Sequence, residues 1–277
     1  MKLSFRKMQA AGNDFVVIDA VRQAIDLTPE QIRYLADRRL GIGCDQVLLV
    51  EPPRTPDADF RYDIYNADGG EAGQCGNGAR CLGRFISEKR LSKQHELVLE
   101  VGDGTMRLQL DQKGGVQANL GAPSFALESI PFKALEQAVE YPLSLNERVL
   151  KAGVLSMGNP HAVLLVNDCA NTPVATLGAL VQGLEVFPDS ANVGFMQVRS
   201  RNQVDLRVCE RVVGETPACG SGACAAVVHG IRLGLLDREV TVSLPGGKLR
   251  VSWEEDDAPV WLSGPATTVY DGTIVLR

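Results

Sequence analysis

The sequence predicts an α+β protein of two pseudo-symmetric domains that arose by internal duplication. Residues 74–79 are nearly repeated at 218–223, and the cysteines inside these segments, Cys75 and Cys219, lie 144 positions apart. Each half also has the pattern of many short strands with one long helix, and regular helices do not separate the strands. We therefore expect each domain to be a mostly antiparallel sheet around a central helix, with the active site in the cleft between the two domains.

Other residues keep nearly the same spacing. Asn13 and Asn159 each precede an apolar run, at an offset of 146 positions, and Asn66 and Glu210 each lie nine residues before a motif cysteine. A chain of 277 residues is long enough for two domains of ordinary size. We expect one domain at 1–120, joined by a C-terminal strand at 265–277, and a second domain at 121–264.

The predicted elements follow the same order in both halves. The capping hydroxyl of Thr28 and the fixed φ of Pro29 indicate a helix start, and this helix is expected to run to Arg39, before the glycines at 41 and 43. Among the remaining elements, alternation and turn residues predict the strands and hairpins, and apolar or small residues at helical spacing predict the helix after Cys75. In the first half these are strands at 15–19, 46–50 and 61–65, a helix at 77–89 and a hairpin of 96–100 with 105–110; in the second half they are strands at 162–166, 193–198 and 204–208, helices at 172–183 and 221–233 and a hairpin of 240–244 with 248–251.

Composition limits the partners. The net charge is −6 and no Lys/Arg run is present, which argues against nucleic acid or an anionic membrane surface as a partner. The first ten residues lack the apolar stretch of a signal peptide, and no segment approaches the roughly 18 apolar residues of a membrane helix. We expect a cytoplasmic protein that binds a small molecule, with neither a membrane nor a nucleic acid as partner.

The cysteine pattern indicates reduced thiols. Seven cysteines, an odd number without a secretion signal, argue against a disulfide framework. The spacings from Cys75 to Cys81 and from Cys219 to Cys224 do not match zinc motifs, and no histidine lies nearby in sequence. We expect no metal.

Each motif cysteine is predicted to lie at the start of a helix, in a glycine-containing turn. Glycines allow close approach of a ligand, and the unpaired N–H groups and positive helix end favour a carboxylate and are expected to lower a thiol pKa. Two such thiols, one entering as thiolate and one as thiol, suit inversion of a stereocentre by proton removal from one face and return to the other. The alternatives are a pair of buried structural cysteines, or a phosphate site, for which neither glycine-rich phosphate motif is present.

Several polar residues accompany the two turns. His161 and Glu210 could accept a thiol proton; alternatively His161 is a strand-end residue bonded to backbone, and Glu210 is solvated or paired with Arg211. The asparagines are common at strand ends for backbone reasons, but together with Arg211 they could bind a second polar head of a substrate. These asparagines are Asn13, Asn66, Asn159 and Asn192.

The combined motifs resemble the diaminopimelate epimerase family over nearly the whole chain. They are residues 11–15, 41–46, 66–69, 74–81, 157–161, 210–211 and 214–224. The resemblance implies two similar α+β domains around a cleft and cofactor-independent interconversion of L,L- and meso-diaminopimelate, a precursor of lysine and peptidoglycan.

The resemblance also implies residue roles. Cys75 and Cys219 would be the two acid/bases, assisted by His161 and Glu210, and Tyr270 would lie at a homodimer contact. The amides of Gly76, Asn77, Gly220 and Ser221 would bind the reacting carboxylate. The site would also be lined by Asn13, Gln46, Asn66, Asn159, Asn192, Glu210 and Arg211.

Two residues depart from the family pattern, and two other functions stay open. Cys209 stands where we expect an aromatic residue, and Pro217 where we expect a residue other than proline, which leaves the loop before Cys219 undefined. The first alternative is a related two-cysteine racemase acting on proline or hydroxyproline, a substrate without the second charged head that Arg211 would bind. The second is a thiol redox switch that uses Cys75 and Cys219.

Overall fold

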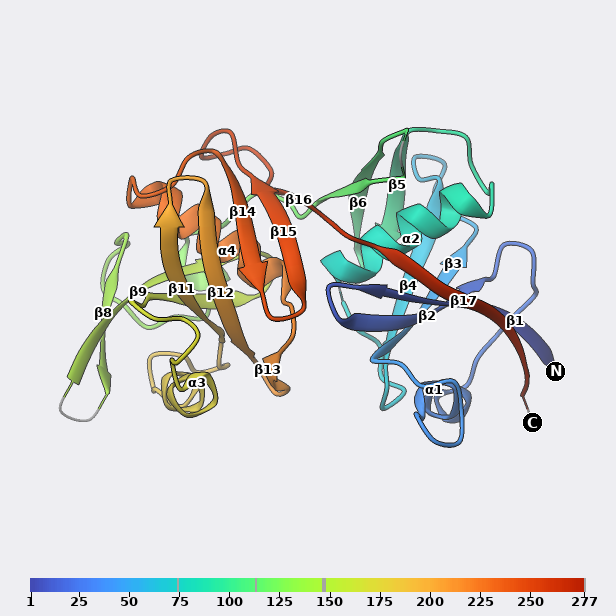
Figure 1. Ribbon diagram of the computed structural model, residues 1–277, viewed down its shortest axis with the longest axis horizontal. Helices are drawn as coiled ribbons and strands as arrows, with labels where there is room; N and C mark the ends of the chain where they lie inside the picture. Colours follow the sequence, from blue (N-terminus) through green and yellow to red (C-terminus); the bar gives the residue numbers. More distant parts are fainter. Residues whose placement is uncertain (74, 113, 146–147, 277) are drawn as a thin grey trace. The chain divides into compact units, whose positions relative to one another are not determined.

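The chain divides into two compact units. The computed structural model describes residues 1–73, 75–112, 114–145 and 148–276 (Figure 1). One unit is Met1–Asn119 together with Ser263–Arg277, and the other is Leu120–Leu262. Gln74, at the start of the first repeated motif, and Arg277, at the end of the expected terminal strand, lie outside the described residues.

In the first unit, a mostly antiparallel sheet surrounds one long helix. Its elements are β1 (Lys2–Ala10), β2 (Asn13–Asp19), α1 (Pro29–Ala36), β3 (Gln46–Glu51), β4 (Phe60–Asn66), α2 (Gly76–Glu88), β5 (Glu96–Val101), β6 (Gly104–Leu110), β7 (Val116–Asn119) and β17 (Thr267–Val275). β1 pairs antiparallel with β17 and with β2, so the end of the chain returns to this unit. β2 and β3 are parallel, β3 and β4 antiparallel, β4 and β5 parallel, and β5, β6 and β7 antiparallel in turn.

The second unit repeats this order of pairing. Its elements are η1 (Leu127–Ser129), β8 (Tyr141–Leu145), β9 (Arg148–Ser156), β10 (Pro160–Leu165), α3 (Val174–Gln182), β11 (Asn192–Ser200), β12 (Gln203–Glu210), β13 (Gly214–Thr216), α4 (Gly220–Arg232), β14 (Glu239–Leu244) and β15 (Gly247–Ser252), while β16 (Trp261–Gly264) spans the unit boundary. β9 and β10 are antiparallel, β10 and β11 parallel, β11 and β12 antiparallel, β12 and β14 parallel, and β14 and β15 antiparallel. The predicted α+β class, with two similar halves, is confirmed.

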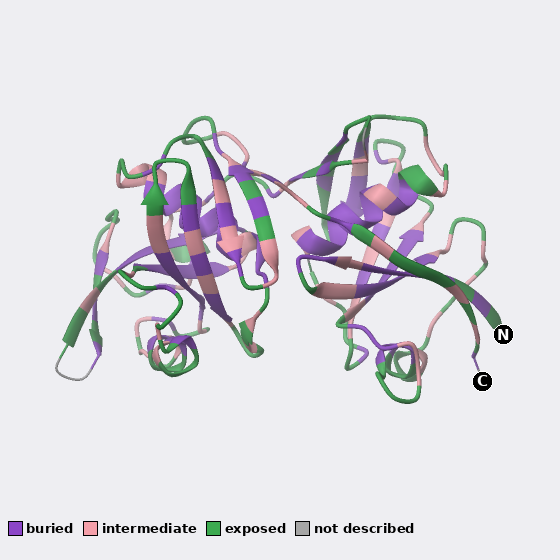
Figure 2. Cartoon of the chain, viewed as in Figure 1, coloured by how far each residue is buried: buried purple, intermediate pink, exposed green. Residues whose placement is uncertain are grey.

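The central helix of each unit is α2 or α4. α2 contacts β1, β2, β3, β6 and β7, and α4 contacts β9 to β12 and β15. Small residues such as Ala223 and Ala226 allow α4 to be buried on nearly every side, and Figure 2 shows both helices largely buried. β3, one of the strands beside α2, is buried on both faces, because Leu48 faces Gly78 of α2 while Val47 and Leu49 join the core cluster that contains α1.

The first helix is shorter than expected. Thr28 caps α1 as predicted, since its Oγ1 accepts from the N–H of Gln31 at 3.3 Å and Gln31 Oε1 accepts from the N–H of Thr28 at 3.1 Å. The helix ends at Ala36, not Arg39, because Asp37 adopts an extended backbone and its carboxylate accepts from the N–H groups of the next residues, Arg39 and Leu40, at 2.7 Å each. The side chain of Asp37 therefore competes with the helix for these donors.

Candidate active site

Cys75 is the N-cap residue of α2. Its backbone is extended, with φ −139° and ψ 107°, and its Sγ accepts from the N–H of Gly78 at 3.4 Å. The sulfur thus occupies the position that a serine or aspartate oxygen takes in an ordinary cap. The thiol is partly exposed and lies at the positive end of the helix.

Cys219 is the N-cap residue of α4, in the same geometry. Its φ is −113° and its ψ is 114°, and its Sγ accepts from the N–H of Gly222 at 3.3 Å. Ser221 Oγ lies 3.6 Å from the sulfur. Unlike Cys75, Cys219 is only 5% exposed. The sequence repeat therefore corresponds to a structural repeat of thiol-capped helices.

The second glycine of each motif, three residues after the cysteine, has close neighbours. A Cβ atom on Gly78 would collide with the hydroxyl of Tyr62. A Cβ atom on Gly222 would lie 3.1 Å from Val208 Cγ2 and 3.2 Å from Cys219 Sγ. Glycine is thus required at 78 by a close neighbour, and favoured less strongly at 222.

The expectation of a lowered thiol pKa is wrong for Cys219. Burial raises the pKa of Cys219 well above 9, and the carboxylate of Glu210 raises it further. The hydroxyl of Ser221 and the N–H of Gly222 act in the opposite direction but do not compensate. Loss of hydration around a thiolate outweighs the helix end, so Cys219 is a protonated thiol in this structure.

Three of the predicted residues of the first unit lie at one edge of its sheet. Asn13 starts β2, Gln46 starts β3 and Asn66 ends β4. Because β2 and β3 are parallel and β3 and β4 antiparallel, these ends meet at the same edge. Gln46 Nε2 donates to Asn66 Oδ1 at 3.0 Å, and Cys75 Sγ lies 3.8 Å from Asn13 Oδ1.

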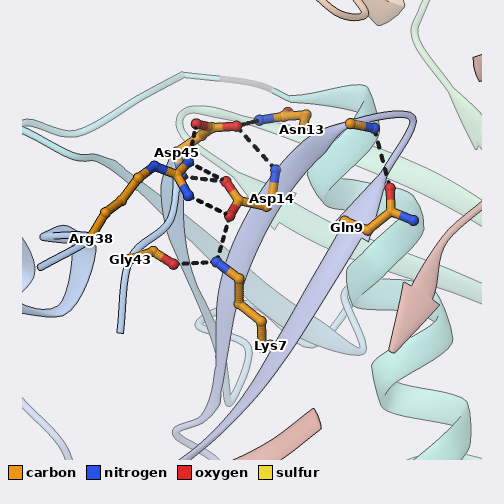
Figure 3. A network of polar contacts seen from close by, with 8 residues as sticks. Lys7, Gln9, Asn13, Asp14, Arg38, Gly43 and Asp45 are labelled. Carbon is orange, nitrogen blue, oxygen red and sulfur yellow. Dashed lines mark hydrogen bonds and ion pairs between the residues drawn. The ribbon is translucent and has the colours of Figure 1, made fainter. Parts of the chain in front are cut away.

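A charged network holds Asn13 in place (Figure 3). Asn13 Nδ2 donates to Asp45 Oδ2 at 2.8 Å, and Asp45 also pairs with Arg38 at 2.8 Å. Asp14 bridges Arg38, at 2.7 Å, and Lys7, at 2.6 Å. Burial alone would raise the pKa of Asp14, but hydrogen bonds from Arg38 and Lys7 bring it well below its usual range. Sequence reasoning assigned no role to Lys7, Arg38 or Asp45; the adjacency of Asp45 to Gln46 was the available signal.

The second unit places its predicted residues in the equivalent way. Asn159 precedes β10, Asn192 starts β11 and Glu210 ends β12. Asn192 Oδ1 accepts from the N–H of Arg211 at 2.9 Å, and Arg211 Nη1 donates to the carbonyl of Asp189 at 3.1 Å. The Glu210 carboxylate accepts from Thr216 Oγ1 and is close enough to Cys219 to raise its pKa.

Among the described residues, hydrogen bonds connect His161 to Cys219 through Asn159 and Ser221. Its Nε2 lies 2.8 Å from Asn159 Oδ1, Asn159 Nδ2 donates to Ser221 Oγ at 3.4 Å, and Ser221 contacts Cys219. His161 is 1% exposed, and burial lowers its pKa to about 3. It is therefore a neutral imidazole, and the donor to the Asn159 oxygen is Nε2–H.

Of the two departures from the family pattern, the structure explains Cys209 but gives no reason for a proline at position 217. The buried side chain of Cys209 packs so closely against Gly178 of α3 that a Cβ atom on Gly178 would collide with it. Pro217 contributes its carbonyl, which accepts from the N–H of Gly246 at 2.8 Å. Neither residue contacts Cys219 through a hydrogen bond among those of the described residues.

Among the described residues, no group of three or more His, Cys, Asp or Glu side chains is arranged to hold a metal ion. Within the described parts of the chain, none of the helices has the length and apolar character needed to cross a membrane.

Comparison with known proteins identifies the family. A family model described as diaminopimelate epimerase matches residues 5–126 and 153–269. Diaminopimelate epimerases of Teredinibacter turnerae and Laribacter hongkongensis are 50% and 52% identical to this chain, over 276 and 278 residues, and all of each chain is covered.

Solved structures support the fold. A probable proline racemase from Agrobacterium radiobacter superposes with a TM-score of 0.70 at 16% identity, covering 99% of this chain and 93% of that one. A phenazine biosynthesis protein of the PhzF family from Bacillus anthracis gives a TM-score of 0.69 at 15% identity, covering all of both chains. The family match, the full-length identity of about one half and the shared two-domain fold show that this chain belongs to the diaminopimelate epimerase family and is an isomerase of the epimerase class.

Proposed function

We propose that this protein interconverts L,L- and meso-diaminopimelate without a cofactor, using Cys75 and Cys219 as a thiolate and thiol pair. The observation that carries the proposal is the duplicated cap. Cys75 accepts from Gly78 at 3.4 Å and Cys219 from Gly222 at 3.3 Å, each at the start of a buried helix. Two equivalent thiols are the smallest set of groups that can serve the two faces of one α-carbon.

The helix starts also suit the substrate carboxylate. The first N–H groups of a helix have no partner within the helix and lie at its positive end. In our proposal the N–H groups of Gly76, Asn77, Gly220 and Ser221 bind the reacting carboxylate and stabilise the negative charge that builds up on it when the α-proton leaves.

The far end of the substrate would be recognised by polar side chains. Asn192 and Arg211 are joined by a 2.9 Å hydrogen bond, and Glu210 lies beside them at the end of β12. A guanidinium and a carboxylate together suit the carboxylate and ammonium of a second amino-acid centre. We assign Asn13, Gln46, Asn66 and Asn159 to the same substrate as further polar contacts.

Each proton transfer is balanced. A thiolate takes the α-hydrogen as a proton, and the electrons of the C–H bond pass into the substrate, which becomes a planar enediolate. The other thiol then gives its proton to the opposite face of the same carbon. Nothing is oxidised or reduced, and the two sulfurs have exchanged their protonation states.

The raised pKa of Cys219 fits the role of proton donor. Burial keeps Cys219 protonated, so it can deliver a proton to the intermediate. In the reverse direction it must lose that proton, and Glu210 is the adjacent carboxylate that would accept it. His161 is neutral and acts through Asn159 and Ser221.

The direct test is turnover of L,L-diaminopimelate by reduced protein without pyridoxal phosphate, with the stereoisomers separated by chiral chromatography. We expect meso-diaminopimelate to appear. Racemisation of proline or hydroxyproline in its place would assign the chain to that activity, and no turnover of either substrate, with a reversible Cys75–Cys219 disulfide, would indicate a redox switch.

The role of Arg211 gives a second test of the substrate. Arg211→Ala should raise the KM for diaminopimelate about tenfold or more, as expected for loss of a charged hydrogen bond. Arg201→Ala is a matched control, because Arg201 is an exposed arginine of the same unit that pairs with Asp237 at 2.7 Å. An unchanged KM in Arg211→Ala would contradict a role in binding the distal group.

We further propose that the protein is a cytoplasmic homodimer. Val269, Tyr270 and Val275 of β17 are 55%, 45% and 65% exposed, and an exposed apolar strand suits a partner surface. Two working thiols also need a reducing compartment. Sedimentation of wild type and Tyr270→Glu would test the dimer; we expect a shift toward monomer in the variant.

A further inference from the structure

Arg80 is a charged residue buried inside α2, one turn beyond Cys75. Its side chain is fully buried, with 0% exposure. Its guanidinium turns back toward the start of the helix, where Nη1 donates to the carbonyl of Gly76 at 3.2 Å and Nη2 to Asn77 Oδ1 at 2.8 Å. Arginine is seldom fully buried, because removal of its charge from water is costly. Its presence here therefore suggests a specific role.

One consequence is the orientation of Asn77. Since Arg80 occupies the Asn77 oxygen, the Asn77 amide must direct its NH2 group elsewhere, and Nδ2 lies 3.5 Å from Asn13 Oδ1. Asn13 in turn lies 3.8 Å from Cys75 Sγ. Arg80 thus fixes the amide next to Cys75, although it touches no expected substrate atom.

The second thiol turn has no equivalent cation. Alignment of the two motifs places Cys224, also 0% exposed, at the position of Arg80. In the same alignment Glu210, nine residues before Cys219, is equivalent to Asn66, nine residues before Cys75. The second half therefore has a carboxylate where the first half has a neutral amide. The first thiol therefore has a positive neighbour and the second a negative one, so the duplicated turns have opposite electrostatic surroundings.

We propose that Arg80 is a positioning residue that holds the Asn77 amide and makes Cys75, not Cys219, the thiolate-bearing cysteine of the substrate-free protein. The assignment of a base and an acid rests on the proposed function, but the protonation order of the two thiols is a property of the protein alone. Arg80 contributes through its fixed charge and through its hydrogen bond to Asn77.

Among the described residues, Tyr62, Cys81 and Asp45 are further ionisable groups near Cys75, and none of these three opposes this order. Tyr62 donates to the Cys75 carbonyl at 3.4 Å, and burial raises its pKa, so it stays neutral. Burial likewise raises the pKa of Cys81 to about 12. Asp45 lies behind Asn13, and its charge is matched by Arg38 at 2.8 Å. Tyr62 and Cys81 each respond electrostatically to both Cys75 and Arg80, which places the thiol and the guanidinium in one neighbourhood.

The experiment is alkylation by iodoacetamide across pH 5 to 10, without substrate, with each cysteine quantified from its own peptide by mass spectrometry. The readout is the pH midpoint of alkylation, which reports the thiolate fraction and not the exposure of the sulfur. We compare wild type with Arg80→Gln, which keeps a donor for Asn77 but loses the charge, and Arg80→Lys, which keeps a charge but loses the forked geometry.

In wild type the midpoint for Cys75 should lie below that for Cys219. Arg80→Gln should raise the Cys75 midpoint by about one pH unit, the effect of one charge at close range, and leave the Cys219 midpoint unchanged. Arg80→Lys should keep the Cys75 midpoint within about 0.3 unit of wild type while raising the KM for diaminopimelate, because Asn77 is held less firmly.

An unchanged Cys75 midpoint in Arg80→Gln would overturn the proposal, and so would a wild-type Cys75 midpoint at or above that of Cys219. If the Gln variant does not fold, the wild-type comparison still tests the protonation order of the two thiols, and the unchanged midpoint with a raised KM expected of Arg80→Lys still tests the role of Arg80. Failure of the proposed function would look different: wild type would not epimerise diaminopimelate, whereas the midpoints, measured without substrate, would keep the expected order.

Discussion

The two thiol turns share a backbone frame but differ in the residues that support them. Both cysteines cap a buried helix and accept from an N–H three residues later, at 3.4 Å in the first unit and 3.3 Å in the second. Arg80 lies behind the partly exposed Cys75, and Glu210 lies beside the buried Cys219. The duplication has thus preserved the geometry of the cap and changed its electrostatics.

The equivalent asparagines illustrate the same difference. Asn13 gives its NH2 group to Asp45 and turns its oxygen toward Asn77, whereas Asn159 gives its oxygen to His161 and turns its NH2 group toward Ser221. The negatively charged acceptor Asp45 thus holds the Asn13 amide, and the neutral donor His161 holds the Asn159 amide. A reaction that needs one base and one acid is served better by unequal halves than by identical ones, and four experiments can break or sharpen this comparison.

The largest effect should come from the thiols. Cys75→Ser and Cys219→Ser should each lower kcat by about 10³-fold or more, because a serine hydroxyl is a much poorer acid/base at neutral pH. The double variant should be no worse than either single variant, since the pair acts as a unit.

The matched control for the thiol variants is Cys169→Ser. Cys169 is buried in the second unit and its Sγ donates to the carbonyl of Phe195 at 3.4 Å, a bond that serine can also make. This variant should keep normal turnover. Substantial activity in either Cys75→Ser or Cys219→Ser would show that one thiol suffices.

The second largest effect concerns acid stability, which we expect to depend on the second unit. Burial lowers the pKa of His161 to about 3 and that of His229 to about 4, below the unfolded value of 6.5. The folded state thus favours the neutral form of both histidines. Their contribution to the free energy of unfolding is fully present above pH 6.5, and it is lost as the pH falls toward 4, because the unfolded chain binds protons first. By proton linkage, each histidine lowers the free energy of unfolding at pH 4 by about 3 kcal/mol relative to its value at neutral pH.

Urea unfolding between pH 7 and pH 4 measures this loss. His161→Gln and His229→Gln should each show a shallower fall of unfolding free energy with acid than wild type. His95→Gln is the control, because His95 is exposed on the first unit. If the unfolding free energy falls equally steeply with pH in wild type and all three variants, the buried histidines do not cause the loss of stability in acid.

The third effect separates the glycines of the two turns. Gly78→Ala should destabilise the protein by about 2 kcal/mol, as expected for overpacking against the Tyr62 hydroxyl. Gly222→Ala should cost less than about 1 kcal/mol, because its neighbours lie 3.1 and 3.2 Å from the new Cβ and can shift slightly. Chemical unfolding measures both values.

A double variant provides the check on this cause. Tyr62→Phe removes the oxygen that the new methyl group would meet, so Gly78→Ala in that background should lose most of its cost. The explanation fails if the two glycine variants are equally destabilised, or if Tyr62→Phe gives no relief.

The smallest effect should come from the anchor of Asn13. Asp45→Ala removes the acceptor at 2.8 Å and frees the Asn13 amide to rotate, which should raise the KM for diaminopimelate about fivefold, the value of one ordinary hydrogen bond. Asp45→Asn keeps an acceptor oxygen and should stay within about twofold of wild type. Equal KM values in the two variants would show that Asp45 does not orient Asn13.

Local features of the site were predictable from the sequence. The two helix starts at Cys75 and Cys219 were predicted, because apolar and small residues recur at helical spacing after Cys75 and the second motif repeats the first. The α+β class followed from the strand and helix pattern. The start of α1 was correct because Thr28 and Pro29 act locally, but its end was wrong, because Asp37 takes up N–H groups that the helix would otherwise use.

Features that depend on tertiary packing were not predictable. Asp45 reaches Asn13 only because β2 and β3 lie side by side in parallel. The raised pKa of Cys219 arises from burial by distant segments, which no local motif encodes. Arg80 lay within a recognised motif, yet its turn back onto Asn77 and its complete burial became visible only in the fold.

The most direct test of a two-base reaction at unequal thiols is proton NMR of reduced protein with L,L-diaminopimelate in D2O at early times. We predict that deuterium enters the inverted α-carbon of the meso product, while the remaining L,L substrate keeps its α-protons, because one cysteine removes the proton and the other supplies deuterium. Deuterium accumulating in the remaining L,L substrate as fast as in the meso product would indicate a single exchanging base and contradict the account.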